Sequence, residues 1–446
     1  MRRRDFIRTG AGAFAIAAAG KAWGADAPAG RVRLALVGCR EKGRGAAVVL
    51  QAMRVPGVEI AYVCDVDARA MDYAADLVER KGGGRPKKEK DLRRILDDRT
   101  VDGIISETPD HWHAWSAVMA MRAGKAVYVE KPCAFCPQEC QTIIDTWRKT
   151  GMVFQMGSQR RASTPFRLAA EAIRNGELIG KPIWGKTWYM TRRESIGRGK
   201  AVPVPDWLDW DLWQGPAPRV DYRDNMVHYN WHWFLNWGTG ECGNNAVHFV
   251  DIARWCLGVE WPSRVVSTGG KLWMPPDDDW AWPDTQNVTW DFPGGKLITW
   301  EGLSCANVKP YMGVATGAMI YGSDGAAFFG PSANVIVYDK KGGVTRKWDA
   351  TGKSVITNTD DRSGGGWNDT TFEHLRNFVD CIRAKTPEKA FAHAEIGAKS
   401  TFLALAANVA HRCGRPIEID PLTGRLLTPE GAALWGRAYA KGWELA

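Results

Sequence analysis

The sequence predicts two folded domains, an α/β domain with a parallel sheet followed by an α+β domain in which strands dominate. From residue 31 to residue 156, short apolar runs alternate with helical segments, which is typical of parallel strands joined by helical crossovers. From residue 264 to about residue 347, strand-like runs follow one another with turn residues between them. A chain of 446 residues is long enough for two complete cores.

The first domain is predicted to span residues 31–156. Its strands end at polar or Gly-rich turns, where a parallel sheet commonly binds ligands. The predicted strands are 32–37, 58–64, 101–106, 126–129 and 152–156. The predicted helices run from the Gly-rich turn to about residue 54 and over 68–81, 91–98, 113–123 and 138–150.

The second domain is predicted to span residues 157–365, followed by a helical segment over 366–425 and a tail over 426–446. Pro293-Gly294-Gly295 between two alternating runs is a hairpin signature. The predicted helices are 165–175, 241–257 and one long stretch over 369–411, and the first predicted strand is 182–191.

Residues 1–24 are predicted to form a twin-arginine signal peptide. Arg3-Arg4-Asp5-Phe6-Ile7-Arg8 precedes an apolar, Gly/Ala-rich run that is too short to span a bilayer. Five basic residues and one acidic residue in this segment account for four of the nine net positive charges, and no long basic run follows. We therefore expect an exported, periplasmic protein with no nucleic-acid partner and no membrane insertion in its mature form.

The ten cysteines do not form a metal-binding pattern. Cys133, Cys136 and Cys140 cluster, but neither a second CxxC nor a nearby histidine pair completes a zinc set. We expect buried thiols at the start of a helix and no metal.

A Gly-rich turn joins the first strand to the first helix and predicts a site for a dinucleotide pyrophosphate. Gly38 and Gly43 fit the first and third glycines of G-x-G-x-x-G, and Arg40 stands at the second, where it must point away or contact phosphate itself. Asp65 ends the second strand where a carboxylate would accept both ribose hydroxyls, although it could equally cap the next helix. With Val66 next and no adjacent arginine for a 2′-phosphate, NAD is favoured over NADP.

Together, Gly38, Asp65, Thr108-Pro109-Asp110-His111-Trp112-His113 and Glu130-Lys131-Pro132 resemble the Gfo/Idh/MocA family, the relatives of glucose–fructose oxidoreductase and inositol dehydrogenase. The resemblance covers nearly all of residues 31–425. It implies a Rossmann domain followed by an α+β domain with an open, mostly antiparallel sheet, and a segment over 366–425 that packs back on the first domain. The implied substrates are sugars, cyclitols and their derivatives, and the open sheet implies a homo-oligomer.

The resemblance also implies which residues carry the chemistry. Lys131 would hydrogen-bond the reacting hydroxyl beside the nicotinamide, with Glu130 holding it in place, because a positive group polarises a developing carbonyl. The family places an acid, a histidine and a second acid on one helix, with the histidine as proton carrier. His248 and Asp251 match this pattern, but Asn244 replaces the first acid and cannot relay a proton.

Further residues are expected around the cofactor and the substrate. Thr108, Pro109, His113 and Trp213 are predicted to contact the cofactor with Glu130 and Lys131. The predicted substrate-binding residues are Arg160, Arg161, Tyr229, His232 and Asp251. For Arg160 and Arg161 the alternative is an exposed basic loop, and for Glu107 either an acid–base role or a surface ion pair fits.

Three functions fit these residues. The first is a periplasmic NAD-dependent oxidoreductase acting on a sugar or sugar derivative with a tightly retained cofactor, since free NAD is scarce outside the cytoplasm. The second is an NAD-dependent glycoside hydrolase that works by transient oxidation, elimination, water addition and re-reduction, and so needs no net redox change. The third is a non-catalytic sugar-binding protein on the same scaffold.

Overall fold

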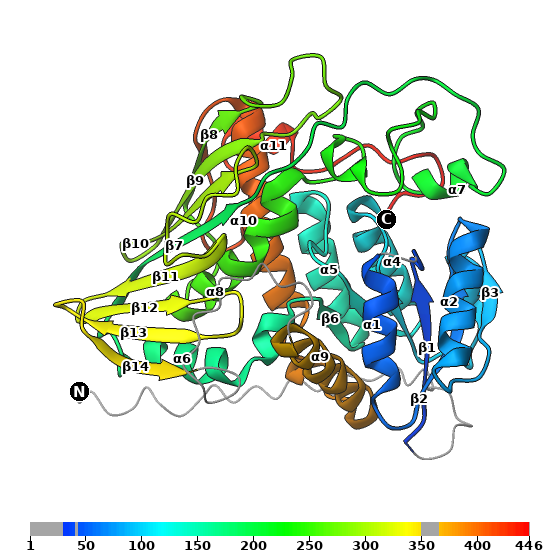
Figure 1. The fold of residues 1–446 in the computed structure, drawn as a ribbon, viewed down its shortest axis with the longest axis horizontal. Coiled ribbons are helices and arrows are strands. Elements are labelled where there is room, and N and C mark those ends of the chain that lie inside the picture. The colour runs from blue at the N-terminus through cyan, green and yellow to red at the C-terminus, as the bar shows by residue number, and fades with distance from the viewer. Residues whose placement is uncertain (1–29, 41–42, 349–364, 446) are drawn as a thin grey trace, which may run out of the picture.

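A computed structural model describes residues 30–40, 43–348 and 365–445, with the backbone alone for residues 365–369. Two sheets stand side by side, a parallel sheet in the first domain and a larger, mostly antiparallel sheet in the second (Figure 1). The predicted twin-arginine segment, residues 1–24, lies outside the described residues. Within the described ranges, every helix is too short or too polar to cross a bilayer.

The first domain is a Rossmann fold with a six-stranded parallel sheet in the order β3-β2-β1-β4-β5-β6. Its strands are β1 (Val32–Val37), β2 (Val58–Cys64), β3 (Lys87–Glu89), β4 (Gly103–Ser106), β5 (Ala126–Val129) and β6 (Phe154–Met156). Its helices are α1 (Arg44–Met53), α2 (Ala68–Arg80), α3 (Leu92–Asp97), α4 (Asp110–Arg122) and α5 (Pro137–Thr150). The predicted alternation is confirmed, and β3 is a short strand that the sequence did not predict.

The sheet is buried on both faces, which explains its near-continuous apolar strands. Leu34 and Leu36 of β1 join one core with α1 and α9 (Gly365–Ala384). Ala35 and Val37, on the opposite face, join the core formed with α4 and α5. Because all six strands are parallel, their carboxyl ends meet at one edge, and the predicted site residues follow these ends.

The second domain is built on a nine-stranded sheet in the order β14-β13-β12-β11-β7-β10-β9-β8-β15. Its strands are β7 (Pro182–Met190), β8 (Arg264–Gly270), β9 (Thr285–Phe292), β10 (Lys296–Leu303), β11 (Thr316–Gly322), β12 (Gly325–Phe329), β13 (Val335–Asp339), β14 (Val344–Trp348) and β15 (Ile417–Glu418). The predicted β9–β10 hairpin is confirmed, and the β7–β10 pair is parallel in an otherwise antiparallel sheet.

Helices cover one face of this sheet and join it to the first domain. α8 (Val247–Leu257) packs on β7 and β11, and α10 (Ala394–Cys413) lies between β8 and α5 (Figure 1). The remaining helical elements are η1 (Gln159–Ala162), α6 (Thr164–Arg174), α7 (Trp210–Gln214), η2 (Asn230–Trp233), η3 (Cys242–Ala246), η4 (Pro387–Lys389) and α11 (Pro429–Ala433).

The single long helix expected over residues 369–411 is wrong, because α9 and α10 are separate. α9 ends at Ala384, Lys385 has a positive φ of 54°, and Pro387 follows. A proline cannot donate the hydrogen bond that would continue the helix. α9 packs on α1 and η1, whereas α10 packs on α5, α8 and β8, so the break lets one segment contact both domains.

Candidate active site

The turn after β1 allows the backbone to approach closely. Gly38 has φ +90°, and a Cβ there would lie 2.5 Å from the carbonyl oxygen of Glu107. A Cβ on Gly45 would lie 2.2 Å from the carbonyl oxygen of Gly38. Gly43 fits the third glycine of the motif by sequence. In the structure, however, a side chain would clash more severely at Gly45 than at Gly43. Arg40 is exposed, and its carbonyl oxygen accepts a hydrogen bond from the Gly43 N–H at 3.0 Å.

Asp65 links the end of β2 to this turn. Its Oδ2 accepts from the Cys39 N–H at 2.6 Å and its Oδ1 from the Asp67 N–H at 3.0 Å. Burial raises the pKa of Asp65. The N-cap of α2 is Asp67, whose side chain accepts a hydrogen bond from the Arg69 N–H. Asp67, and not Asp65, therefore caps this helix.

A dinucleotide fits this edge of the sheet. The first turn of α1 contains no acidic residue and receives no hydrogen bond from a capping side chain, so its N–H groups suit a pyrophosphate. Asp65 lies one strand away, at the position that accepts ribose hydroxyls in such folds. The nicotinamide end would then lie over β4 and β5, where Thr108 and Lys131 follow the strands.

Glu130 and Lys131 end β5 in a dense polar network. Glu130 is buried and accepts hydrogen bonds from Arg44 Nε at 3.0 Å and Gln159 Nε2 at 2.8 Å. Burial alone would raise the pKa of Glu130, but the charges of Arg44 and Lys131 outweigh it and hold that pKa below its usual value. Glu130 is therefore a carboxylate that fixes Arg44 and the Lys131 backbone.

The Lys131 ammonium reaches across to the second domain. Its Nζ donates to the backbone oxygen and to the Oδ1 of Asn244, both at 2.8 Å. Burial lowers the pKa of Lys131, although Glu130 and Asp110 oppose this shift. Asn244 thus orients Lys131 by accepting two hydrogen bonds from its ammonium group. The ammonium group can still donate a further hydrogen bond.

Asn244 lies in a π-helical turn, η3, which leads directly into α8. The sequence predicted one ordinary helix over residues 241–257. The ordinary α-helix is wrong over Cys242–Ala246, where a π turn holds more residues than the α turn it replaces. Such turns occur frequently at functional sites.

His248, in the first turn of α8, is the candidate base. Neither of its ring nitrogens has a hydrogen-bond partner among the described residues. Burial lowers the pKa of His248 well below its usual value, and the nearby charges of Arg160, Lys131 and Arg44 lower it further. The imidazole is therefore neutral and can accept a proton at neutral pH.

Arg161 and Asp251 are placed differently from the expectation that they bind substrate. Their side chains form a buried bidentate ion pair, with Nε–Oδ2 at 2.7 Å and Nη2–Oδ1 at 2.8 Å. Ser400 of α10 also donates to Asp251 Oδ1 at 2.5 Å. Because these groups satisfy one another, we revise their role to fixing α8, and with it His248, against η1 and α10.

Arg160 has a different environment from its neighbour Arg161. Its guanidinium carbon lies 4.6 Å from the centre of the Phe249 ring, and its buried Nε has no hydrogen-bond partner. Burial lowers the pKa of Arg160 to about 10, and Arg44 contributes to that shift. The structure thus places Arg160 beside His248 and not on an exposed basic loop.

His232 and Tyr229 lie on the segment that includes η2. The His232 ring stacks on Trp231 at 3.6 Å, and its Nδ1 lies 2.6 Å from the carbonyl oxygen of Tyr229. Burial lowers the pKa of His232 to about 3, with contributions from the charges of Lys131, Arg193 and Arg40. His232 therefore belongs to the neighbourhood of Lys131. The Tyr229 hydroxyl accepts from Arg193 Nη1 at 3.0 Å.

Glu241 and Arg193, two charged residues that were not predicted as site residues, also lie near Lys131. Glu241 is buried and pairs with Arg193 Nε at 2.5 Å, and it also accepts from the Asn245 side chain. Its charge raises the pKa of Lys131. Glu241 could have been identified from the sequence, because it is the first residue of the predicted 241–257 helix. Arg193 lies just beyond β7 and carried no motif.

His113 and Trp213 hold loops in place around the cofactor edge. The His113 Nδ1 lies 2.6 Å from the Pro132 oxygen and its Nε2 lies 2.8 Å from the Thr108 oxygen, so the ring bridges the loops after β4 and β5. Trp213 is buried, and its carbonyl oxygen accepts from Trp112 Nε1 at 2.9 Å. His113 and Trp213 thus act through these loops.

Glu107 follows β4, and its carboxyl group is buried. Both of its side-chain oxygens lack a hydrogen-bond partner among the described residues. Burial and the charge of Glu130 raise the pKa of Glu107 well above its usual value, against the opposing charges of Arg44 and Lys131. The alternative of a surface ion pair is therefore wrong, and Glu107 is a protonated acid at the cofactor edge.

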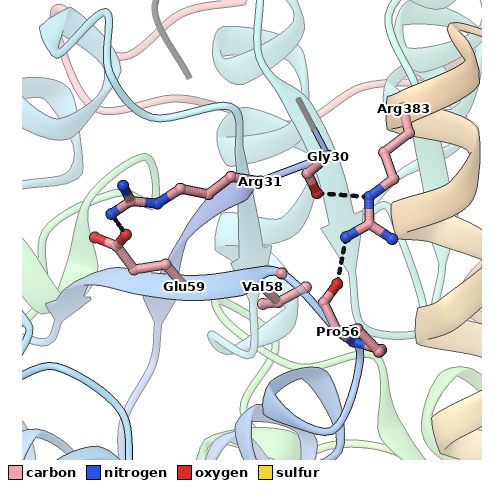
Figure 2. Close-up of a pocket in the computed structure, with 7 residues that line it drawn as sticks. Gly30, Arg31, Pro56, Val58, Glu59 and Arg383 are labelled. Atoms are coloured by element: carbon pink, nitrogen blue, oxygen red, sulfur yellow. Dashed lines mark hydrogen bonds and ion pairs between the residues drawn. The ribbon is translucent and has the colours of Figure 1, made fainter. Parts of the chain in front are cut away.

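A pocket lined by Arg31, Pro56, Glu59 and Arg383 lies elsewhere (Figure 2). It sits at the amino ends of β1 and β2, opposite the edge that carries Asp65. Arg383 donates to the carbonyl oxygens of Gly30 and Pro56, and Arg31 pairs with Glu59. These groups are satisfied by one another, so this pocket contributes nothing to the candidate active site.

A dinucleotide edge facing a half-buried lysine and a neutral histidine defines the class of protein, a two-domain oxidoreductase with a nicotinamide cofactor. Family models agree with this class. Residues 32–158 match "Oxidoreductase family, NAD-binding Rossmann fold", and residues 183–323 match "Oxidoreductase family, C-terminal alpha/beta domain". The chain therefore belongs to the Gfo/Idh/MocA family of oxidoreductases. This membership argues against the non-catalytic sugar-binding protein.

Individual relatives cover different parts of the chain. A scyllo-inositol 2-dehydrogenase (NAD(+)) from Bacillus subtilis (strain 168) is 26% identical over 371 residues, 82% of this chain and 90% of that protein. A glycosyl hydrolase family 109 protein from Stenotrophomonas maltophilia (strain K279a) is 30% identical over 292 residues, 60% of this chain and 62% of that protein. A solved levoglucosan dehydrogenase, in complex with NADH and levoglucosan, has the same fold, with a TM-score of 0.65 at 19% identity over 87% of this chain and 99% of that chain.

Proposed function

We propose that this protein oxidises a secondary alcohol of a sugar or sugar derivative by hydride transfer to NAD. The observation that carries the proposal is the meeting of Lys131 from the first domain with Asn244, in the turn that leads to His248. Relatives that act on scyllo-inositol and levoglucosan support a polyhydroxylated ring as substrate.

Each residue has one task in this reaction. NAD⁺, when bound, supplies the hydride acceptor. Lys131 donates a hydrogen bond to the reacting oxygen and stabilises the negative charge that develops on it. His248 accepts the hydroxyl proton while the carbinol carbon loses its hydride, which leaves a carbonyl group. Asn244 fixes the Lys131 ammonium but does not take up the proton.

The test uses two substitutions and one control. Lys131→Ala and His248→Ala should each lower kcat/KM by at least about 100-fold, because each removes a group that acts in the transition state. Lys88→Ala, at an exposed ion pair with Asp72, should leave kcat/KM unchanged. Normal turnover in either site variant would overturn the assignment.

A second candidate is a redox-neutral glycoside hydrolase with NAD as a recycled cofactor. The relative named for glycosyl hydrolase family 109 favours it, and so does Asn244, which departs from the acid expected for simple dehydrogenation. Incubation with aryl glycosides separates the two candidates. Release of the aglycone without accumulation of NADH would favour the hydrolase, and stoichiometric NADH formation from the free sugar would favour the dehydrogenase.

We further propose that the protein is exported in folded form with NAD already bound. The twin-arginine pattern Arg3-Arg4 and the scarcity of free NAD outside the cytoplasm support this proposal. Arg3→Lys with Arg4→Lys should retain the protein in the cytoplasm. Mass analysis of the nucleotide released from denatured periplasmic protein should find NAD and not NADP.

We also propose a homo-oligomer that forms through the face of the nine-stranded sheet opposite α8. Tyr321 on β11 is exposed there and stacks on Trp184 of β7, and aromatic side chains on an uncovered sheet face favour association. Light scattering on the purified protein would measure a multiple of the chain mass of 49.4 kDa.

A further inference from the structure

Four arginines surround the candidate active site, and three of them have a carboxylate partner. Arg44 pairs with Glu130, Arg161 with Asp251 and Arg193 with Glu241. Arg160 forms no ion pair with any carboxylate among the described residues. Arg160 is half-buried, its Nε is buried, and the described residues supply no carboxylate partner for it, which leaves a ligand to do so.

The surroundings of Arg160 indicate that the group that pairs with its guanidinium belongs to the substrate. One face of its guanidinium lies over the Phe249 ring at 4.6 Å, and its Nε is buried without a hydrogen bond. Phe249 is the residue next to His248, and the charge of Arg160 acts directly on the imidazole. The guanidinium thus lies over Phe249 beside the candidate base, with donors left for a ligand.

We propose that Arg160 binds an anionic group of the substrate, so that the natural substrate is an acidic sugar that carries a carboxylate, sulfate or phosphate. A guanidinium donates two parallel hydrogen bonds to each of these groups. The inference rests on the proposed function, since it names the substrate class of that same site.

The charge balance of the site supports an anionic substrate. Lys131, Arg44 and Arg160 all act on His248, and all three disfavour the imidazolium that proton transfer would form. A negative charge bound at Arg160 would offset the largest of these three effects. The substrate would then raise the pKa of His248 toward the working pH and make it a stronger base.

The alternative source of the missing partner is the cofactor, and position argues against it. Arg160 follows β6, at the end of the sheet, whereas the Gly38 turn and Asp65 follow β1 and β2. The pyrophosphate of a dinucleotide bound at the Gly38 turn therefore lies over other strands. The experiment separates these two sources directly.

The experiment measures binding to the full-length protein saturated with NADH, by calorimetry, for matched pairs of sugars. The pairs are D-glucuronate with D-glucose and D-galacturonate with D-galactose, and glucose 6-phosphate and glucose 6-sulfate extend the test to the other anions. We expect the protein to bind one of the acids about 10- to 100-fold more tightly than its neutral counterpart. Arg160→Gln should abolish this preference, and Arg160→Lys should restore part of it.

Arg167→Gln is the matched control, because Arg167 is exposed and lies over the Phe391 ring at 5.3 Å. It should leave the preference unchanged. The inference is overturned if no acid in the panel is preferred to its neutral partner, or if Arg160→Gln weakens NADH binding and leaves the sugar preference intact. If the protein oxidises neutral sugars and shows no preference for acids, the proposed function stands and this inference fails. If it shows an Arg160-dependent preference for acids but no hydride transfer, this inference stands and the proposed function fails.

Discussion

At the scale of single residues, the site depends on buried groups whose charge is set by their neighbours. Glu130 and Glu107 lie close enough to act on one another, yet Glu130 is ionised and Glu107 holds its proton. The difference follows from their contacts, because Arg44 and Gln159 donate to Glu130 whereas Glu107 has no donor among the described residues. Two carboxyl groups with opposite protonation are a common feature of acid–base sites.

Glu107 should make the protein less stable as the pH rises. Its pKa is raised in the folded protein, so above the unfolded value of about 4.3 the native state binds more protons than the unfolded state. Stability is then lost as pH rises from that value through the folded pKa. Glu107→Gln should therefore raise the urea midpoint at about pH 7 and leave it unchanged at about pH 4.

Equal urea midpoints for Glu107→Gln and the wild-type protein at both pH values would contradict a protonated, buried Glu107. Glu79→Gln serves as the control, because Glu79 lies on the surface in an ion pair with Arg85. Its removal should change the midpoint little at either pH, since exposed ion pairs contribute about 0–1 kcal/mol.

Much of this residue-scale picture could be predicted from the sequence. Asp65, Lys131 and His248 follow strand ends or begin a helix, and local sequence is enough to locate such positions. The pairing of Arg161 with Asp251 could not be predicted, because it joins residues 90 positions apart that only the tertiary fold brings together. Glu241 was missed since the expected acid, at position 244, is an asparagine.

At the scale of elements, the Arg161–Asp251 pair should dominate the stability of the contact between α8 and η1. Arg161→Met leaves the Asp251 carboxylate buried without its main partner, which typically costs about 3–5 kcal/mol. Urea unfolding followed by circular dichroism measures this loss. Lys88→Met, at an exposed pair, should change stability by less than about 1 kcal/mol.

The turn before α1 gives a second prediction at this scale. Gly45→Ala would place a methyl group 2.2 Å from the Gly38 oxygen, so the turn must shift. We expect NAD binding, measured by nucleotide retention and by titration, to weaken at least about tenfold because the phosphate cradle is displaced. Gly84→Ala has open space for its methyl group and should bind NAD like the wild-type protein. Wild-type affinity in Gly45→Ala would show that the pyrophosphate binds elsewhere.

At the scale of the whole molecule, the C-terminal tail returns to the first domain. Trp443 is buried against Trp112 and Trp115 of α4, with ring centres 5.1 and 4.8 Å apart. Arg437 pairs with buried Glu139 of α5 and donates to the His111 carbonyl oxygen. The sequence predicted residues 426–446 only as a tail, because these contacts join segments about 300 residues apart.

Trp443→Ala tests the importance of the tail. Truncating a buried tryptophan costs about 3–5 kcal/mol, and here it also loosens α4, which carries His111 and His113. We expect a lower urea midpoint and weaker NAD retention. Leu422→Ala is the control, since Leu422 is 87% exposed and should change neither property. Unchanged stability in Trp443→Ala would show that the tail is dispensable.

The π turn at Cys242–Ala246 has a consequence for how relatives are aligned with this chain. An α-helix advances about 100° per residue, so one inserted residue rotates everything before it relative to everything after it. Counting back from His248 therefore assigns the acidic position to Asn244, whereas the acid of this segment that acts on Lys131, beside Glu130 and Asp110, is Glu241, three residues earlier. Deleting Asn245 should convert the turn to a regular helix and point a different side chain at the lysine. The turn is thus a place in the sequence where one insertion or deletion changes which side chain faces Lys131 while α8 stays in place.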